Sequence, residues 1–234
     1  MKLHKRVLYA AGVAFLLSWT SLIGAEKSAK SIINNAYQYL GSMDKYSFNA
    51  VVSENGDPLN SYKQNVSAKV SRPDKLRVDT KGNIKNRSNY INNGTYTMMD
   101  HNFGFYGQLK TPKTIEGTLD FIFDKYGIKS PMSSLFYKDM DKRMKLKKSK
   151  YFGVVNVDGV SCDYIAFKNN SREIHVWIAI GKAPLVKAYS IIDSNDNSRV
   201  NTSLVWNKNS SIKADDFVFV VPRGASKIVI NSAK

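Results

Sequence analysis

Alternation of apolar and polar residues is the feature that most restricts how this chain of 234 residues can fold. Apolar side chains occupy every second position in residues 46–52, a turn-forming Asn-Gly-Asp-Pro sequence follows, and residues 62–70 alternate again. A strand with this period has one buried face and one solvated face, so the two runs predict an antiparallel hairpin.

Runs with the same period continue on both sides of residues 111–150. They cover residues 76–78, 87–92, 95–99, 104–109, 151–157, 160–167, 173–180, 185–193 and 199–206. We therefore expect a mostly β (α+β) fold, in which a single curled antiparallel sheet of about eleven strands forms an incomplete barrel. No repeat or Gly/Ser linker divides the chain, so residues 26–234 are expected to form one half-barrel domain.

Two regions have apolar residues three and four positions apart instead. The first predicts an N-terminal helix over residues 28–40, and the second predicts a helical lid at residues 115–126 and 132–140, inserted midway along the sheet. Only these helices can cover the concave apolar face of the sheet. If they fill it, the interior is a packed core, and if they only cover it, an apolar cavity lies beneath them.

Residues 1–25 predict export. Lys2, Lys5 and Arg6 precede an apolar run and then small residues up to Ala25, which is the pattern of a signal peptide cleaved after Ala25. An uncleaved membrane anchor is the alternative. Removing this segment takes away three basic residues and no acid from a chain of formal net charge +16. A basic periplasmic protein is expected to meet an anionic membrane surface or an envelope protein, and not nucleic acid.

Residue types that perform chemistry are sparse. His101 and His175 lack the carboxylate or cysteine spacing of a metal site, and neither GxSxG nor a phosphate-binding glycine loop occurs. Cys162 shares its strand parity with apolar residues, which favours a small buried residue over a reactive thiol. A charged outer helix face explains the four acids Asp120, Asp124, Asp139 and Asp141. We expect no enzyme, no metal and no cofactor.

Four segments carry a resemblance to a known family. Residues 70–78, with Arg72 and Pro73, resemble the LolA/LolB-like fold of periplasmic lipoprotein carriers, most closely an uncharacterised branch of predicted periplasmic proteins. The hairpin at residues 92–98, the Thr-Pro-Lys-Thr-Ile segment that begins residues 111–131, and Trp206 with residues 217–225 follow in the expected order. Thr97 and Met98 stand where the carriers have a Trp, and the carriers are not generally so basic.

The resemblance implies a helix-lidded half-barrel that receives acyl chains. It also implies that Arg72 helps to hold the lid closed and is needed for cargo transfer. A guanidinium at a barrel rim can donate to helix-end carbonyls or to a lipid head group, whereas the alternative for Arg72 is a solvent-facing strand residue.

Two hypotheses follow. The first is a non-enzymatic, monomeric periplasmic carrier or chaperone for a lipid or an acylated lipoprotein. Its expected ligand-binding residues are Arg72, Phe48, Tyr62, Val66, Leu76, Val78, Tyr90, Tyr96 and Met98, with Leu119, Ile122, Phe123, Leu135 and Phe136 in the lid. The second is an envelope protein-interaction or sensor module that uses the basic run from Lys142 to Lys150, which could equally be a solvated loop or strand edge.

Overall fold

A computed structural model describes residues 28–55, 62–128, 132–145, 148–169, 171–196, 198–207 and 211–233. The predicted signal peptide and its cleavage site lie outside the described residues. Among the residues that are described, no helix is long and apolar enough to cross a membrane.

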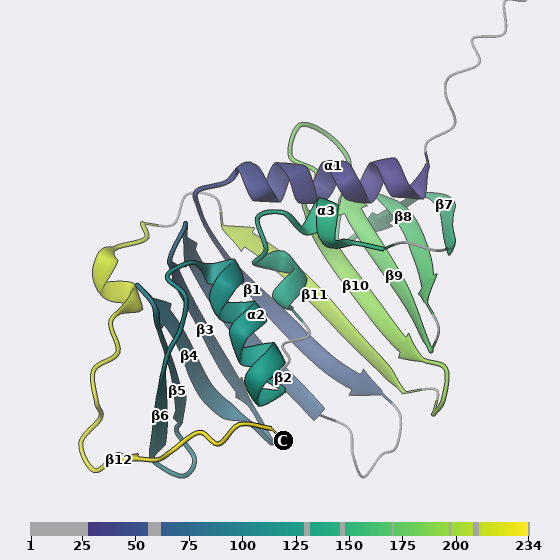
Figure 1. The fold of residues 1–234 in the computed structure, drawn as a ribbon. Helices are drawn as coiled ribbons and strands as arrows, with labels where there is room; N and C mark the ends of the chain where they lie inside the picture. Colours follow the sequence, from purple (N-terminus) through teal and green to yellow (C-terminus); the bar gives the residue numbers. More distant parts are fainter. Residues whose placement is uncertain are drawn as a thin grey trace, which may run out of the picture.

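Twelve strands form one open sheet (Figure 1). The first half is a meander of β1 (Lys45–Asn55), β2 (Tyr62–Ser71), β3 (Lys75–Gly82), β4 (Asn86–Asn92), β5 (Thr95–Asp100) and β6 (Phe105–Lys110). The second half is a meander of β7 (Lys148–Val157), β8 (Val160–Asn169), β9 (Arg172–Ala179), β10 (Val186–Asp193) and β11 (Arg199–Asn207). The first and last long strands, β1 and β11, join the halves by antiparallel pairing. The eleven predicted strands are therefore confirmed.

The twelfth strand is short and differs in direction. β12 (Ser226–Lys227) pairs in parallel with β6, which gives the order β12-β6-β5-β4-β3-β2-β1-β11-β10-β9-β8-β7. The two ends of this order do not pair with each other, so the sheet is curled but not closed, as the sequence predicts.

The helices lie on one face of the sheet, which curves around them (Figure 1). α1 (Ala29–Ser42) begins at Ser28, whose hydroxyl accepts a hydrogen bond from the Ser31 amide at 3.0 Å, and buries its apolar stripe. We use the word lid for α2 (Ile115–Tyr126), the 3-10 turn η1 (Ser133–Leu135) and α3 (Met140–Arg143), together with residues 136–139 between the last two. The lid is inserted between β6 and β7, where the change of period predicts it.

One helix of the lid is shorter than predicted. The sequence favours a continuous helix from residue 132 to 140, but η1 ends at Leu135 and α3 starts only at Met140. The backbone groups that a continuous helix would need are bonded elsewhere. The Leu135 carbonyl accepts a hydrogen bond from the Tyr46 hydroxyl at 2.6 Å, and the Lys138 amide donates to Glu116 at 3.0 Å.

Strand register decides which side chains face the helices. Phe48 lies opposite Ala68, and Ala68 lies opposite Val78, so these positions share the inner face. Tyr90 lies opposite Arg77 on the outer face, and its ring packs 5.5 Å from that of Phe219. The prediction that Tyr90 lines the concave face was wrong. Helices cover the inner face of β4 and C-terminal residues cover its outer face, so two adjacent apolar residues are buried there and the alternation fails.

The C-terminal strap, residues 214–233, connects the two faces of the sheet around its β6 edge (Figure 1). It starts with the 3-10 turn η2 (Ala214–Phe217) on the outer face, where Phe217 is buried. After β12, Ile230 lies on the inner face against Gly107. The contact is so close that a Cβ added to Gly107 would lie 2.5 Å from the Cγ1 atom of Ile230. The Ala233 amide then donates to the Lys125 carbonyl at the end of α2, at 3.1 Å. The strap therefore ties the sheet edge to the lid.

One ion pair attaches the strap to the outer face and gives it a pH dependence. Lys69 Nζ lies 2.6 Å from Asp216 Oδ1, and this hydrogen bond, together with that from the Lys213 amide, lowers the pKa of Asp216 from its ordinary value. A carboxyl whose pKa is lower when folded stabilises the protein above the unfolded pKa of about 3.9, and this contribution is lost as the pH falls through the folded pKa. We expect the stability difference between the wild type and Asp216→Asn to shrink as the pH falls below about 4.

Urea unfolding across this pH range measures the difference. Asp215→Asn is the matched control, because it removes the neighbouring carboxylate without touching Lys69. A difference for Asp216→Asn that stays constant down to acid pH would contradict the assignment.

Candidate functional site

The apolar inner face and the lid are in direct contact. The Phe48 ring stacks on Phe136 of the lid, with centroids 6.0 Å apart and planes at 12°, and it lies 4.9 Å from the ring of Trp206. Ile115 and Leu135 of the lid are at most 1% exposed. In this structure the lid segments fill the part of the concave face that they cover.

Most of the predicted ligand-binding residues belong to this contact. The buried members on the sheet and lid are Phe48, Val66, Leu76, Tyr96, Leu119, Ile122, Leu135 and Phe136. Tyr62, Val78 and Met98 are partly buried and pack against the same core. The strand residues predicted to line the concave face therefore do form one continuous apolar surface there, except for Tyr90, which lies on the outer face.

Phe123 differs from the other lid residues. Its side chain is 47% exposed, whereas Leu119 and Ile122 on the same helix are buried. Helix α2 directs Ile115, Leu119 and Ile122 towards the sheet, and Phe123 stands at the margin of this stripe. The expectation that Phe123 faces the interior fully is not met.

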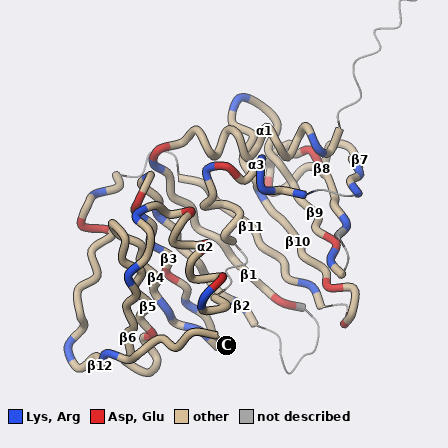
Figure 2. Tube along the Cα trace, viewed as in Figure 1, with Lys and Arg blue, Asp and Glu red and all other residues tan. Residues whose placement is uncertain are grey.

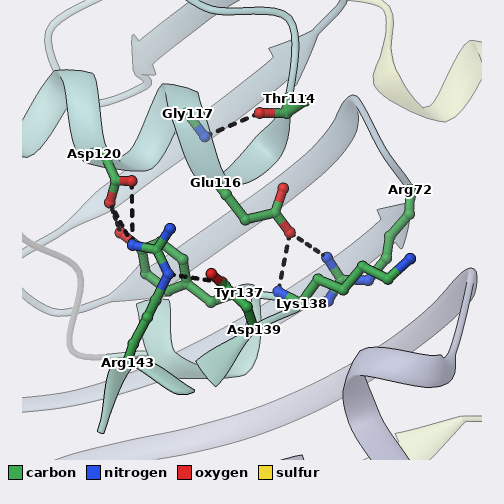
Figure 3. Close-up of polar contacts among 9 residues, drawn as sticks. All are labelled: Arg72, Thr114, Glu116, Gly117, Asp120, Tyr137, Lys138, Asp139 and Arg143. Atoms are coloured by element: carbon green, nitrogen blue, oxygen red, sulfur yellow. Dashed lines mark hydrogen bonds and ion pairs between the residues drawn. The ribbon is translucent and has the colours of Figure 1, made fainter. Parts of the chain in front are cut away.

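Arg72 connects the sheet to the lid (Figure 3). It occupies the connection between β2 and β3, and its side chain is only 4% exposed. Its Nη1 donates to Glu116 Oε1 at 2.8 Å, and its Nη2 donates to the Tyr46 hydroxyl at 3.3 Å. The solvent-facing alternative for Arg72 is therefore wrong.

The first turn of α2 positions the Glu116 carboxylate next to the Arg72 guanidinium. Thr114 caps the helix, with its Oγ1 accepting from the Gly117 amide at 3.1 Å, and Glu116 lies in the first turn, where the helix dipole favours an acid. The Ile115 amide also donates to the Pro73 carbonyl at 2.8 Å, next to Arg72. We call Arg72, Glu116, Tyr46 and the Lys138 amide the rim latch.

The latch is buried but not fully satisfied. Burial raises the pKa of Tyr46, so its hydroxyl stays protonated and donates to the Leu135 carbonyl. Arg72 Nε is buried with no hydrogen-bond partner among the described residues. A buried ion pair with an unsatisfied donor contributes little net stability, although removing one partner is costly.

A second, more exposed cluster lies farther along the lid (Figure 3). Arg143 Nη1 bonds both oxygens of Asp120 at 3.0 and 3.1 Å, and its Nε donates to Asp139 at 2.7 Å. The Tyr137 hydroxyl donates to Asp120 at 2.9 Å. These side chains contact each other within the lid and do not reach the sheet residues of the latch. Asp120 and Asp139 thus form a charged outer face, as predicted.

The sequence reasoning identified Arg72 but missed its partners. Glu116 carried a usable signal, since it is an acid in the first turn after a Thr that can cap a helix. Tyr46, which contacts Arg72, and the Lys138 amide, which donates to Glu116, carried none, because they come from a strand and a turn distant in sequence.

Other predicted chemistry is as follows. Cys162 is 0% exposed, as expected for a small buried residue. His175 lies on the outer face of β9, where its side chain is 15% exposed and contacts Tyr164 at 2.6 Å and Glu173 at 2.9 Å. Cross-strand packing against Tyr164 covers its ring. Within the described ranges, His, Cys, Asp and Glu form no group of three or more that could hold a metal ion.

The structure is an open half-barrel with a helical lid, which is the fold that the sequence resemblance implies. The chain belongs to the family of predicted periplasmic proteins DUF2092, whose model matches residues 29–231. The predicted resemblance is therefore confirmed. A search of curated proteins gives no match.

Solved structures extend the likeness in fold. An uncharacterised conserved protein from Thermus thermophilus is 9% identical with a TM-score of 0.54, covering 87% of this chain and 99% of that one. The lipoprotein LppX of Mycobacterium tuberculosis is 13% identical with a TM-score of 0.45, covering 79% and 97%. A LolA superfamily protein from Nitrosomonas europaea is 6% identical with a TM-score of 0.40, covering 82% and 98%.

Proposed function

We propose that this protein is a non-enzymatic periplasmic carrier or chaperone that binds a lipid or a lipoprotein acyl chain between the inner sheet face and the lid. The observation that carries the proposal is the rim latch. A continuous apolar surface is covered by segments that are not part of the sheet, and a buried ion pair between Arg72 and Glu116 fastens them. A lid attached in this way can separate from the sheet without breaking strand pairing.

The free energy of burying an acyl chain is similar to that of the contacts between the lid and the sheet. Exposing the buried apolar side chains of Ile115, Leu119, Ile122, Leu135 and Phe136 would cost about 1.5–3 kcal/mol each, or about 8–15 kcal/mol together. An acyl chain of about fourteen methylenes returns about 11 kcal/mol when buried. The two quantities are similar, so a single acyl chain inserted between the lid and the sheet can offset the contacts that these two lose with each other.

The residues divide by role under this proposal. Phe48, Val66, Leu76 and Tyr96 form the floor for the acyl chain, whereas the partly exposed Tyr62, Val78 and Met98 lie nearer its entry. Once released from Glu116, the Arg72 guanidinium can bind a carbonyl or an anionic head group of the cargo. The proposal assigns no catalytic step to any residue.

Under this proposal the protein is exported to the periplasm. Cleavage after Ala25 would release a mature half-barrel of residues 26–234 into the periplasm, in agreement with the description of its family as predicted periplasmic. There it would act in outer-membrane biogenesis. The molecule that co-purifies with the protein would show whether the cargo is a free lipid or an acylated lipoprotein.

Opening the latch is expected to increase uptake of an acyl probe. In Glu116→Gln the carboxylate is replaced by an amide of the same size, which weakens the attraction to Arg72. We expect the apparent Kd of the mature protein for a fluorescent long-chain fatty acid to fall about tenfold. This corresponds to a closed state that is less stable by about 1.4 kcal/mol relative to the open state that binds the probe. Fluorescence titration measures it.

Asp120→Asn is the matched control. It alters a carboxylate one turn further along the same helix, which pairs with Arg143 and does not contact Arg72. We expect an affinity close to that of the wild type. Absence of probe binding in the wild type and in Glu116→Gln would contradict the proposal, and native mass spectrometry of protein purified from its host would name the cargo class.

A second candidate function is an envelope interaction module. The observation that favours it is the position of β7, which ends the sheet and exposes Lys148 and Lys150. Residues 146–147 of the basic run lie outside the described residues. Loss of a co-purifying acidic protein in Lys148→Glu with Lys150→Glu, without any change in acyl-probe binding, would favour this candidate.

A further inference from the structure

Exposed apolar side chains gather at one end of the first half of the sheet. Two hairpin turns and the strap meet there, because the His101 amide donates to the Asn86 carbonyl at 2.9 Å and the Ser226 amide donates to the Gly104 carbonyl at 2.9 Å. We call the exposed apolar residues of this region the tip surface. They are Ile84 (61% exposed), Phe103 (73%), Phe105 (43%), Ile228 (40%) and Val229 (82%).

The tip surface is held in place by backbone contacts. The Asp100 carboxylate accepts from the amides of Asn102 and Phe103 at 3.1 and 3.3 Å, and Gly104 has a φ of +67° that favours glycine. The Ile228 amide donates to the Tyr106 carbonyl at 2.8 Å. Phe103 therefore projects from a fixed turn, and its exposure follows from the fold.

Basic residues accompany these apolar side chains. Lys85, Arg223 and Lys227 are exposed in the same turn and strap segments. No Asp or Glu occurs in residues 101–115 or 217–234, and Figure 2 shows basic positions on the strap near β12. Asp100 is engaged by Arg87 at 2.9 Å, and its side chain is only 16% exposed.

We propose that the tip surface docks on an anionic phospholipid bilayer. Bulky apolar side chains on projecting turns can enter the head-group region, while flanking Lys and Arg side chains reach anionic head groups. Phe103 is 73% exposed and Val229 is 82% exposed, and the flanking basic side chains are exposed as well, so both kinds of side chain are accessible to a bilayer. This inference is independent of the proposed cargo, because the tip surface lies outside the contact between lid and sheet.

Vesicle flotation tests the proposal. We expect the mature protein to bind phosphatidylcholine vesicles that contain phosphatidylglycerol, more weakly at higher salt, and not to bind pure phosphatidylcholine. Phe103→Ser with Val229→Ser should reduce the partition coefficient by about tenfold, since two exposed apolar side chains are lost. Arg223→Glu with Lys227→Glu should reduce it by about tenfold or more.

Matched variants elsewhere separate a specific surface from overall charge. Val154→Ser with Val205→Ser removes two exposed valines outside the tip surface, and Lys148→Glu with Lys150→Glu reverses two exposed charges on β7. We expect each to bind within about twofold of the wild type. Equal losses in these controls would overturn the proposal, because binding would then depend only on the net charge of the chain.

A direct measurement locates the inserted side chain. Brominated acyl chains in anionic vesicles should quench the tryptophan fluorescence of Phe103→Trp. The quenching seen with Val205→Trp should not exceed the quenching of the native tryptophans in the wild type. Absence of quenching at position 103, or a tip surface that binds a protein and no vesicle, would overturn the proposal.

Discussion

Glu116→Ala is expected to lower the free energy of unfolding by about 3–5 kcal/mol, because it leaves a buried guanidinium without its counter-ion. The Arg72 side chain is 4% exposed, so water cannot replace the lost carboxylate. The same substitution removes the acceptor of the Lys138 amide. The midpoint of urea unfolding, at an unchanged m-value, measures the loss.

The two partners of this ion pair should respond unequally. Arg72→Met leaves the Glu116 carboxylate 20% exposed and still bonded to the Lys138 amide, so we expect a smaller loss of about 1–3 kcal/mol. The double variant should lose less than the sum of the single variants, because no charge is then buried alone.

Asp120→Ala is the control for the loss of a carboxylate from α2. The pair that it breaks with Arg143 is 35–43% exposed, which limits the expected cost to about 0–1 kcal/mol. If Glu116→Ala cost no more than Asp120→Ala, the rim latch would not be a buried ion pair in solution.

Phe136→Ala should cost about 3–5 kcal/mol, because it opens a cavity between the lid and the sheet. Phe136 is 1% exposed and stacks on Phe48. The matched control is Phe123→Ala, which deletes the same side chain from a lid position that is 47% exposed. We expect its cost to be about 1 kcal/mol.

This pair of variants also bears on the cargo. If an acyl chain inserts between the lid and the sheet, Phe136→Ala should retain acyl-probe binding at temperatures where it is folded, since the sheet floor at Phe48 is intact. Equal destabilisation by Phe123→Ala and Phe136→Ala would show that the lid does not pack as the structure places it.

The long strands could be predicted because each half of the sheet alternates cleanly where only one face is covered. Residues 49–52 and 62–70 are examples, since their outer side chains are partly or fully exposed and their inner ones meet the helices. Prediction failed at Tyr90, where the strap covers the outer face and removes the difference between the two sides of β4. It also failed in the lid, where Tyr46 and Glu116 bind the backbone groups that a longer helix requires.

The sequence by itself determined the strands, the position of the lid between β6 and β7, the family, and Arg72 as a candidate, since periodicity and local motifs depend on near neighbours in the chain. Only the tertiary structure decided that Arg72 pairs with Glu116, that the lid packs on the sheet, and that the strap reaches the turn that carries Phe103. These contacts join residues far apart in sequence. Their geometry depends on sheet curvature and strand register, which no local pattern specifies.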